Sequence, residues 1–243
     1  MTYRNAPIVE AIIDVRVKFA SVPTFDKLKN FAKRYGGQFS VEEIKQVNVE
    51  MQIGKDKAKV TRKETKETGF KLTNLAAPRV LQFHQNGFLY SHLAPYSSWE
   101  IFSHEAKEHW ETFNTTFRPV SISRFAIRTI NRIMIPSRHF KLEEYLSLYP
   151  QGPDAIGVLS RFYLQLQMPQ ENLNPPGFSL INVATGEKED ESHTPIMLDI
   201  DLFAHGDFPP DSSVLWSYLD EYRSRKNHIF ENCITDATRN LIS

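Results

Sequence analysis

A strict alternation of apolar and polar residues runs from Pro7 to Phe19 and constrains the fold more than any other feature of the chain. The odd positions of this stretch are all apolar, whereas all of its charged residues are at even positions. Side chains alternate between the two faces of a β-strand, so a period of two predicts a strand with one face in the core. The opposite face carries Glu10, Asp14 and Arg16. These charges need partners on a neighbouring strand, contact with solvent, or a ligand.

The same alternation recurs along the chain and is interrupted by amphipathic segments. Apolar residues take helical spacing at 24–35 and 97–117, and again after Asp211, where a long C-terminal helix is expected. Asn86-Gly87 is the favoured pair for a tight hairpin turn. The first 135 residues are therefore expected to run β-α-β-β-β-β-α-β, which is typical of an antiparallel sheet with helices on one face.

The predicted fold class is α+β, with two lobes of antiparallel sheet and helices packed on one face of each. Residues 1–150 are expected to form the N-terminal lobe, and residues 151–243 a C-terminal lobe of three strands and a helix, β-β-β-α. The boundary rests on the loop QGPDAIG, near residue 150. One continuous domain is the alternative.

Composition excludes several classes of protein. Lys and Arg total 29, as do Asp and Glu, so the excess of positive charge that marks a strongly basic nucleic-acid binder is absent overall. Cys233 is the only cysteine, which leaves no intrachain disulfide and no thiolate metal cluster. The first residues lack the apolar stretch of a signal peptide, and no apolar run approaches the roughly 20 residues of a membrane span. The sequence predicts a soluble, cytoplasmic protein.

Four stretches of the chain carry a resemblance: RNAPIVEAIIDVRV, RVLQFHQNGFLYSHLAPYSSWEIF, FAIRTINRI and WSYLDEYRSRKNHIFENCIT. Together they resemble a sporadically distributed family of uncharacterised bacterial and archaeal proteins of about this length. The resemblance implies little chemistry, because these are mainly packing motifs. The patchy occurrence of the family is similar to that of mobile accessory genes, including toxin–antitoxin and antiphage cargo.

The segment SISRFAIRTINRI places three arginines four residues apart, and therefore on one face of a strand. If this strand neighbours the first one, Glu10 and Asp14 are expected to oppose two of these arginines. The favoured interpretation is a structural ladder of ion pairs, and the second is a groove whose guanidinium groups bind a phosphate or a carboxylate. The candidate binding residues are Glu10, Asp14, Arg124, Arg128, Asn131 and Arg132.

A lysine-rich hairpin, GKDKAKVTRKETKETGFK, is the candidate nucleic-acid surface in the alternative hypothesis. A basic ribbon can follow a phosphate backbone, although lysine also commonly protects an edge strand from pairing with another chain. The candidate residues are Lys55, Lys57, Lys59, Arg62 and Lys63.

No residue set has the spacing of a catalytic or cofactor site. Asp199 and Asp201 lie on the same side of one predicted strand and could share a divalent cation, but no third carboxylate at fixed spacing supports such a site. The chain lacks a phosphate-binding P-loop and a GxGxxG turn. We therefore expect no metal, no cofactor and no catalytic residue.

Two functions follow from these observations. The first is a non-enzymatic interaction module that binds a protein partner, plausibly one encoded beside it. The second is a nucleic-acid or nucleotide-phosphate binder that uses the arginine row and the lysine hairpin. Phosphate binding weakens steeply with salt, whereas a packed protein interface does not, so salt dependence discriminates between them.

Overall fold

The computed structural model describes residues 3–53, 58–137, 139–153, 157, 159–187 and 192–243, and for 47–53 and 58–65 it describes the backbone alone. In this part of the chain, nine strands form one antiparallel sheet in the order β2-β3-β4-β5-β1-β6-β9-β8-β7. The strands are β1 (Ile8–Lys18), β2 (Phe39–Ile53), β3 (Ala58–Asn74), β4 (Arg79–His84), β5 (Gly87–Leu93), β6 (Ser121–Ile135), β7 (Tyr163–Gln170), β8 (Gly177–Thr185) and β9 (Thr194–Phe208). The helices are α1 (Phe25–Ala32), the 3₁₀ turn η1 (Lys33–Tyr35), α2 (Trp99–Phe117), α3 (Leu142–Tyr145), α4 (Ser212–Cys233) and α5 (Asp236–Ile242).

The α+β class, the antiparallel sheet and the long C-terminal helix are as the sequence predicts. The sheet is nevertheless continuous across residue 150, because β6 pairs with β9 from Ile122↔Phe208 to Ile135↔Thr194. The two stretches predicted as separate lobes thus contribute strands to a single sheet.

β1 lies at the centre of the sheet, between β5 and β6. Its apolar row faces the helices, and the four residues Ala11, Ile13, Val15 and Val17 of this row are buried. The condition for the expected ladder is met, because β1 pairs with the SRFAIRTINRI strand, β6, with Asp14 opposite Ala126 and Arg16 opposite Arg124. The charged row of β1 consequently shares the other face of the sheet with the arginines of β6.

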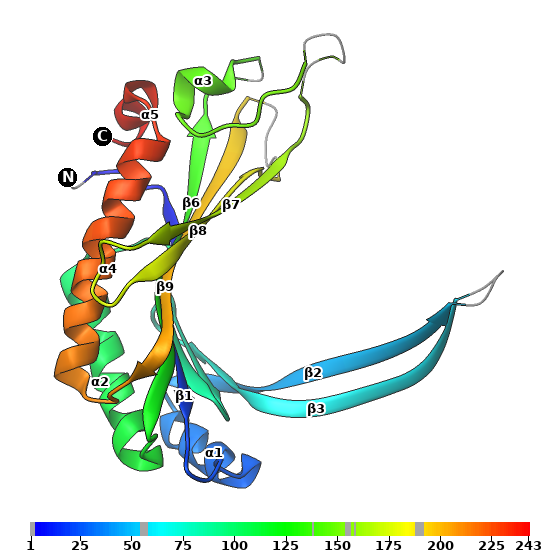
Figure 1. Ribbon diagram of the computed structural model, residues 1–243, viewed down its shortest axis with the longest axis vertical. Helices are drawn as coiled ribbons and strands as arrows, with labels where there is room; N and C mark the ends of the chain where they lie inside the picture. The colour runs from blue at the N-terminus through cyan, green and yellow to red at the C-terminus, as the bar shows by residue number, and fades with distance from the viewer. Residues whose placement is uncertain (1–2, 54–57, 138, 154–156, 158, 188–191) are drawn as a thin grey trace.

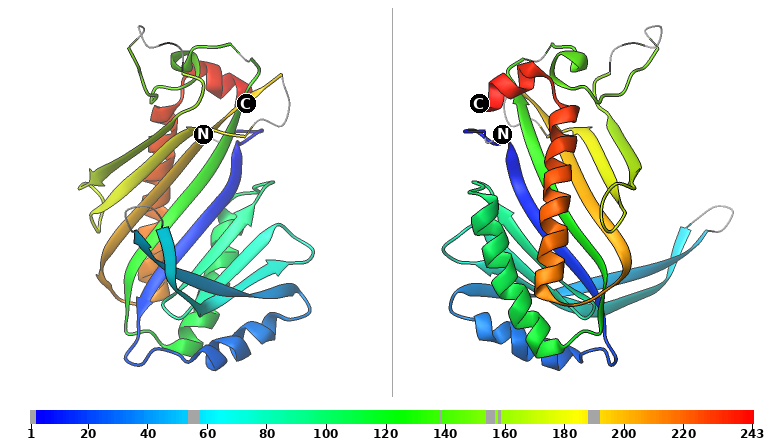
Figure 2. Two further views of the ribbon diagram at one scale, coloured as in Figure 1. Left: turned by 90° about the vertical axis from the view of Figure 1, so that its right-hand side faces the viewer. Right: turned by 60° about the vertical axis from the view of Figure 1, so that its left-hand side comes forward.

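Helices α1, α2 and α4 pack against one face of the sheet (Figures 1 and 2). Aromatic residues fill this layer, and Phe31, Phe83 and Phe113 make ring contacts that join α1, β4 and α2. Each of these helices begins at a side-chain cap; in α2 the Ser98 hydroxyl accepts from the backbone N–H of Ile101. α2 and α4 lie side by side across the middle of the sheet (Figure 2, right).

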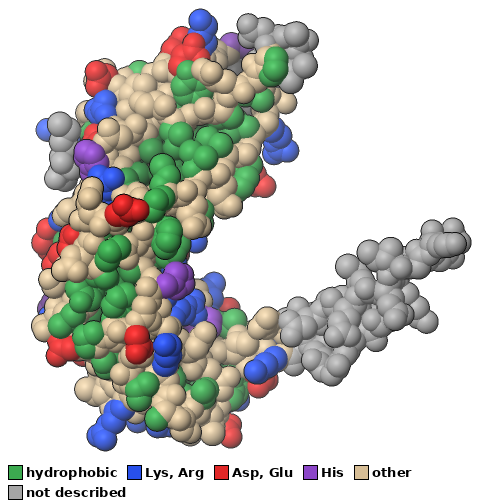
Figure 3. Space-filling model, in the orientation of Figure 1, with side chains coloured by type: hydrophobic (Ala, Val, Ile, Leu, Met, Phe, Trp, Pro, Cys, Tyr) green, Lys and Arg blue, Asp and Glu red, His purple; other side chains and the backbone are tan. Residues whose placement is uncertain are grey.

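The described residues place no helix over the opposite face of the sheet, which we call the open face. It is hollowed, and the β2–β3 hairpin projects from one end of the hollow (Figures 1 and 3). None of the helices in the described part of the chain is long and apolar enough to cross a bilayer.

Candidate functional site

The open face carries a ladder of ion pairs at its centre. Arg124 bridges two strands: its Nη1 donates to Asp14 Oδ2 on β1 at 2.7 Å, and its Nη2 donates to Asp201 Oδ2 on β9 at 2.8 Å. The Arg124 guanidinium also lies 4.7 Å from the ring centroid of Phe203. Arg16 adds a contact from Nε to Asp14 Oδ1 at 2.9 Å. The guanidinium of Arg124 is thus held in place by two carboxylates and a ring.

Arg128 forms the second rung, and its partner differs from the predicted one. Its Nε and Nη2 donate to Oδ1 and Oδ2 of Asp199 at 2.7 and 2.6 Å, a two-pronged pair. Asn182 Nδ2 also donates to Asp199 Oδ2, at 3.0 Å. Glu10 lies on the face of Arg128, as expected, but no ion pair between Glu10 and an arginine is found among the described residues. The charge of Glu10 acts on Arg128, whereas β9 supplies the carboxylate that binds it.

In the ladder, positive and negative side chains balance one another and shift each other's pKa values. The hydrogen bonds that Arg128 donates to Asp199 raise the pKa of Arg128. Burial raises the pKa of Asp201, and the charges of Arg124 and Arg128 oppose that rise. His84 lies on the same face, and burial lowers its pKa to about 4, so it adds no charge at neutral pH. Since Asp199 and Asp201 are bound to guanidinium groups, they do not form a pair open to a cation.

Two further candidate residues lie away from the ladder. Asn131 points to the helix side of the sheet, where it is buried and its Nδ2 donates to the carbonyl oxygen of Leu198 at 2.9 Å. It therefore does not belong to the charged row, as expected from its odd position between Ile130 and Arg132. Arg132 Nη2 donates to the carbonyl oxygen of Glu187 at 3.3 Å.

The lysine-rich hairpin falls largely outside the described residues. Lys55 and Lys57 lie in the gap between β2 and β3, and the side chains of Lys59, Arg62 and Lys63 are not described. Their proposed contact with nucleic acid stays a prediction.

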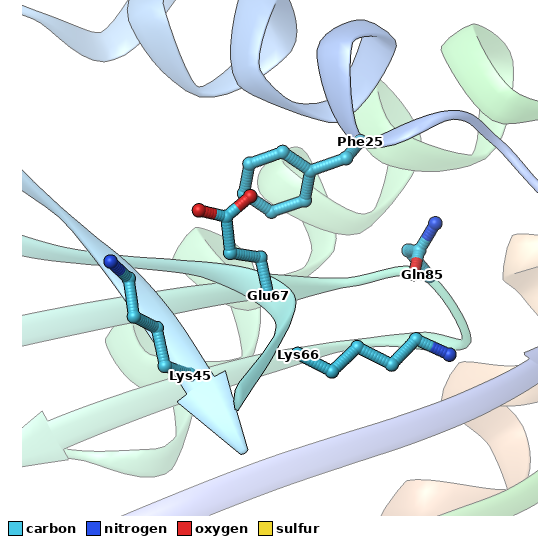
Figure 4. A pocket seen from close by; sticks show the side chains of 5 residues that line it. All are labelled: Phe25, Lys45, Lys66, Glu67 and Gln85. Atoms are coloured by element: carbon cyan, nitrogen blue, oxygen red, sulfur yellow. The ribbon is translucent and has the colours of Figure 1, made fainter. Parts of the chain in front are cut away.

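A hollow of about 590 Å³ lies at the base of the hairpin, lined by Phe25, Lys45, Lys66, Glu67 and Gln85 (Figure 4). The ammonium groups of Lys45 and Lys66 point to opposite ends of the hollow (Figure 4). Lys45 also lies 3.7 Å from Glu43. The two lysines are thus not arranged to hold one anion between them.

A larger cleft of about 910 Å³ opens on the helix side of the sheet, between the first turn of α2 and the second half of α4. The N-terminal segment, the loop before α2 and β6 complete its walls. Lys226 of α4 lines this cleft and is only 6 % exposed, with Nζ donating to Thr129 Oγ1 of β6 at 3.3 Å. Asn131 lines the same cleft. After the ladder on the open face, this cleft is therefore the second site at which buried polar groups lie close together.

Sequence reasoning missed Lys226, although a signal for it exists. The stretch YRSRKNH looks like a basic cluster whose charges complement the dipole of the helix. Yet Leu219, Tyr222, Lys226, Phe230 and Cys233 follow one another at intervals of three or four residues, and all five are buried. A lysine within an apolar stripe of that spacing is a buried lysine, and such residues are rare unless paired.

Comparison with known proteins identifies no family for the chain. No family model matches the chain, and a search of curated proteins finds no significant match. Among the described residues, no group of three or more His, Cys, Asp or Glu side chains is placed to hold a metal ion.

Proposed function

We propose that the protein is a non-enzymatic interaction module whose open sheet face binds a protein partner. One observation carries this proposal: the helices of the described chain cover one face of a nine-stranded sheet and leave the other hollowed and open. A sheet face of this size normally packs against a second layer. In the proposed interaction module, the partner protein supplies this second layer.

The chemistry of the open face fits a protein surface. Apolar side chains lie beside the ladder, among them Phe203 next to Arg124 and Phe178 on β8. The ring of Phe178 lies 5.9 Å from that of Phe203, and this residue is 38 % exposed. Tyr163 on the edge strand β7 is more exposed still. Aromatic and arginine side chains are the types enriched at the centre of protein interfaces.

Charge balance favours a protein over a nucleic acid as the partner. The ladder sets Arg16, Arg124 and Arg128 against Asp14, Asp199 and Asp201. A surface that binds a phosphate backbone needs a surplus of positive charge, which this face lacks at its centre. Binding of nucleic acid or of a nucleotide phosphate rests instead on the lysine-rich hairpin and is the alternative function.

The patchy occurrence of the family that the sequence resembles supports a further step in the proposal. The protein is then a cytoplasmic accessory component, of the antitoxin or antiphage type, whose partner is encoded by a neighbouring gene.

The test begins with purification of the untagged protein from its native cells and identification of co-purifying proteins by mass spectrometry. The dissociation constant of the partner is then measured for wild type, Phe178→Glu on the open face, and Ile101→Glu as a matched control on the exposed side of α2. We expect Phe178→Glu to weaken binding at least tenfold, since it buries a charge in the interface, and Ile101→Glu to leave it unchanged. Binding should survive about 0.5 M salt, at which a phosphate-binding protein loses most of its affinity.

Two outcomes would contradict the proposal. One is the absence of any protein that co-purifies in stoichiometric amount. The other is equal affinity of wild type and Phe178→Glu for the partner that is found.

A further inference from the structure

We propose that the cleft between α2 and α4 binds a small organic acid, whose carboxylate pairs with Lys226 and whose apolar body packs against Trp99 and Phe230. This site lies on the helix side of the sheet, opposite the open face, and does not depend on the proposed protein interaction.

The strongest element of the site is a buried ammonium group that lacks an anion. An ammonium group has three donors, and the hydrogen bonds of the described residues account for one of them, to Thr129 Oγ1. No carboxylate of the described residues forms an ion pair with Lys226, and the charged group that acts on it is the positive Arg223, one turn before it on α4. Burial lowers the pKa of Lys226 to about 7, and Arg223 acts in the same direction. Burying a lysine without a counter-charge is costly, and an acidic ligand removes that cost.

The acidic residues of the cleft do not serve as that counter-charge. Glu231 accepts from Tyr3 Oη at 2.8 Å and from Arg239 Nε at 3.1 Å. Glu100 is exposed at the start of α2. The buried end of the cleft is consequently positive, which selects an anion over a cation.

Part of the remaining wall is apolar and is held in a defined orientation. Trp99 Nε1 donates to Asp220 Oδ1 at 2.8 Å, and the Arg223 guanidinium lies 5.4 Å from the Trp99 ring centroid. Phe230 lies one turn beyond Lys226 on the same face of α4 and lines the cleft. A volume of about 910 Å³ is within the usual range for small-molecule sites, which combine an apolar lining with a few polar groups. The arrangement therefore fits a ligand with one carboxylate and an extended apolar or aromatic body.

The test uses 1-naphthaleneacetate as the probe and 1-naphthaleneacetamide as its uncharged analogue, with calorimetric titration of the whole protein at pH 7. We expect saturable binding of the acid with one site per chain, at least about tenfold tighter than binding of the amide, as for a buried hydrogen bond to a charged group. This preference is measured on wild type and needs no variant.

Two variants then test whether Lys226 causes the preference for the acid. Lys226→Met keeps the length and apolar stem of the side chain and is expected to bind acid and amide alike. Lys33→Met, which removes an exposed lysine at the end of α1, is expected to keep the wild-type preference. If Lys226→Met does not fold, as judged by circular dichroism, Lys226→Gln replaces it, because glutamine keeps a donor for Thr129 without the charge.

Three outcomes would overturn the proposal. The first is a failure of the wild type to bind the acid saturably at millimolar concentration. The second is equal affinity of the wild type for the acid and the amide. The third is a folded Lys226 variant that retains the preference for the acid.

Discussion

The two faces of the sheet differ in whether their buried charged groups have partners of opposite charge. On the open face, Arg124 and Arg128 each meet carboxylates within 2.8 Å, supplied by β1 and β9. On the helix face, the ammonium group of Lys226 meets one hydroxyl and no carboxylate of the described chain. A matched buried pair resists the loss of either member, whereas a lone buried charge opposes folding until a ligand compensates it. The comparison separates charges that hold the sheet together from a charge that is available for binding.

The largest expected effect is the loss of the central rung of the ladder. In Arg124→Met, Asp14 on β1 and Asp201 on β9, the two strands that flank β6, lose their shared partner and repel each other as like charges. Both aspartates are largely buried, as is the arginine, whose side chain is 18 % exposed. We expect the free energy of unfolding at pH 7 to fall by about 3 kcal/mol, measured by urea denaturation.

Lys18→Met is the matched control, at the end of the neighbouring strand β1. Lys18 pairs with Asp207 at 3.3 Å, but both side chains are mostly exposed, so its loss should change the free energy of unfolding by less than about 0.5 kcal/mol. Equal effects of the two substitutions would refute the claim that the ladder is a buried structural element.

The second prediction concerns the helix face, where removing a charge should stabilise the protein. Because the pKa of Lys226 falls from 10.5 to about 7 on folding, the unfolded chain binds more protons between these values, and stability rises with pH across that window. The cost of burying the charge is thus complete below about pH 7 and disappears toward pH 10. Lys226→Met removes this cost and should raise the free energy of unfolding by about 2 kcal/mol at pH 6, within the range that such a shift permits.

The pH profile distinguishes this cause from better packing. The advantage of Lys226→Met over wild type should shrink steadily between pH 7 and pH 9.5, measured without ligand by urea denaturation. Lys33→Met serves as the control and should show no such trend. A destabilised Lys226→Met, or an advantage that does not depend on pH, would mean that the lysine is compensated within the chain.

The elements of the fold could be predicted from the sequence because each leaves a local pattern. The alternation at Pro7–Phe19 and at Ser121–Ile135 identifies the strands and tells which side chains share a face. Asn86-Gly87 identifies the turn between β4 and β5. Alternation alone does not show which distant strand lies alongside, and β1 and β6 could be related only through their complementary charges. The pairing of β6 with β9, which makes one sheet of the predicted lobes, therefore could not be predicted.

The same limit explains which contacts of the candidate site could be predicted from the sequence. That the arginines of β6 need carboxylates follows from their spacing, and Asp14 is indeed a partner of Arg124. From the sequence, Asp199 and Asp201 suggest only a cation pair, because nothing local shows that their carboxylates lie within reach of Arg128 and Arg124. Lys226 differs from these cases. Its position within the apolar stripe of α4 is a local pattern and could have been recognised.

The smallest expected effect comes from Arg128, which belongs to the ladder and to the surface at once. Its guanidinium makes the two-pronged pair with Asp199, yet its side chain is 40 % exposed, against 12 % for the aspartate. In Arg128→Gln, Asp199 keeps the hydrogen bond from Asn182 and gains some contact with water, so the free energy of unfolding should fall by only about 1 kcal/mol. If the open face binds the partner, the affinity of that complex should fall more than this, since binding excludes the water that screens Asp199. Arg128→Lys keeps the charge and loses the two-pronged geometry. Thermal unfolding and partner binding are measured for both variants, and the difference between them shows how much of the effect comes from the charge and how much from the geometry. A loss of stability as large as that of Arg124→Met, with unchanged partner affinity, would place Arg128 wholly within the structural ladder and remove it from the binding surface.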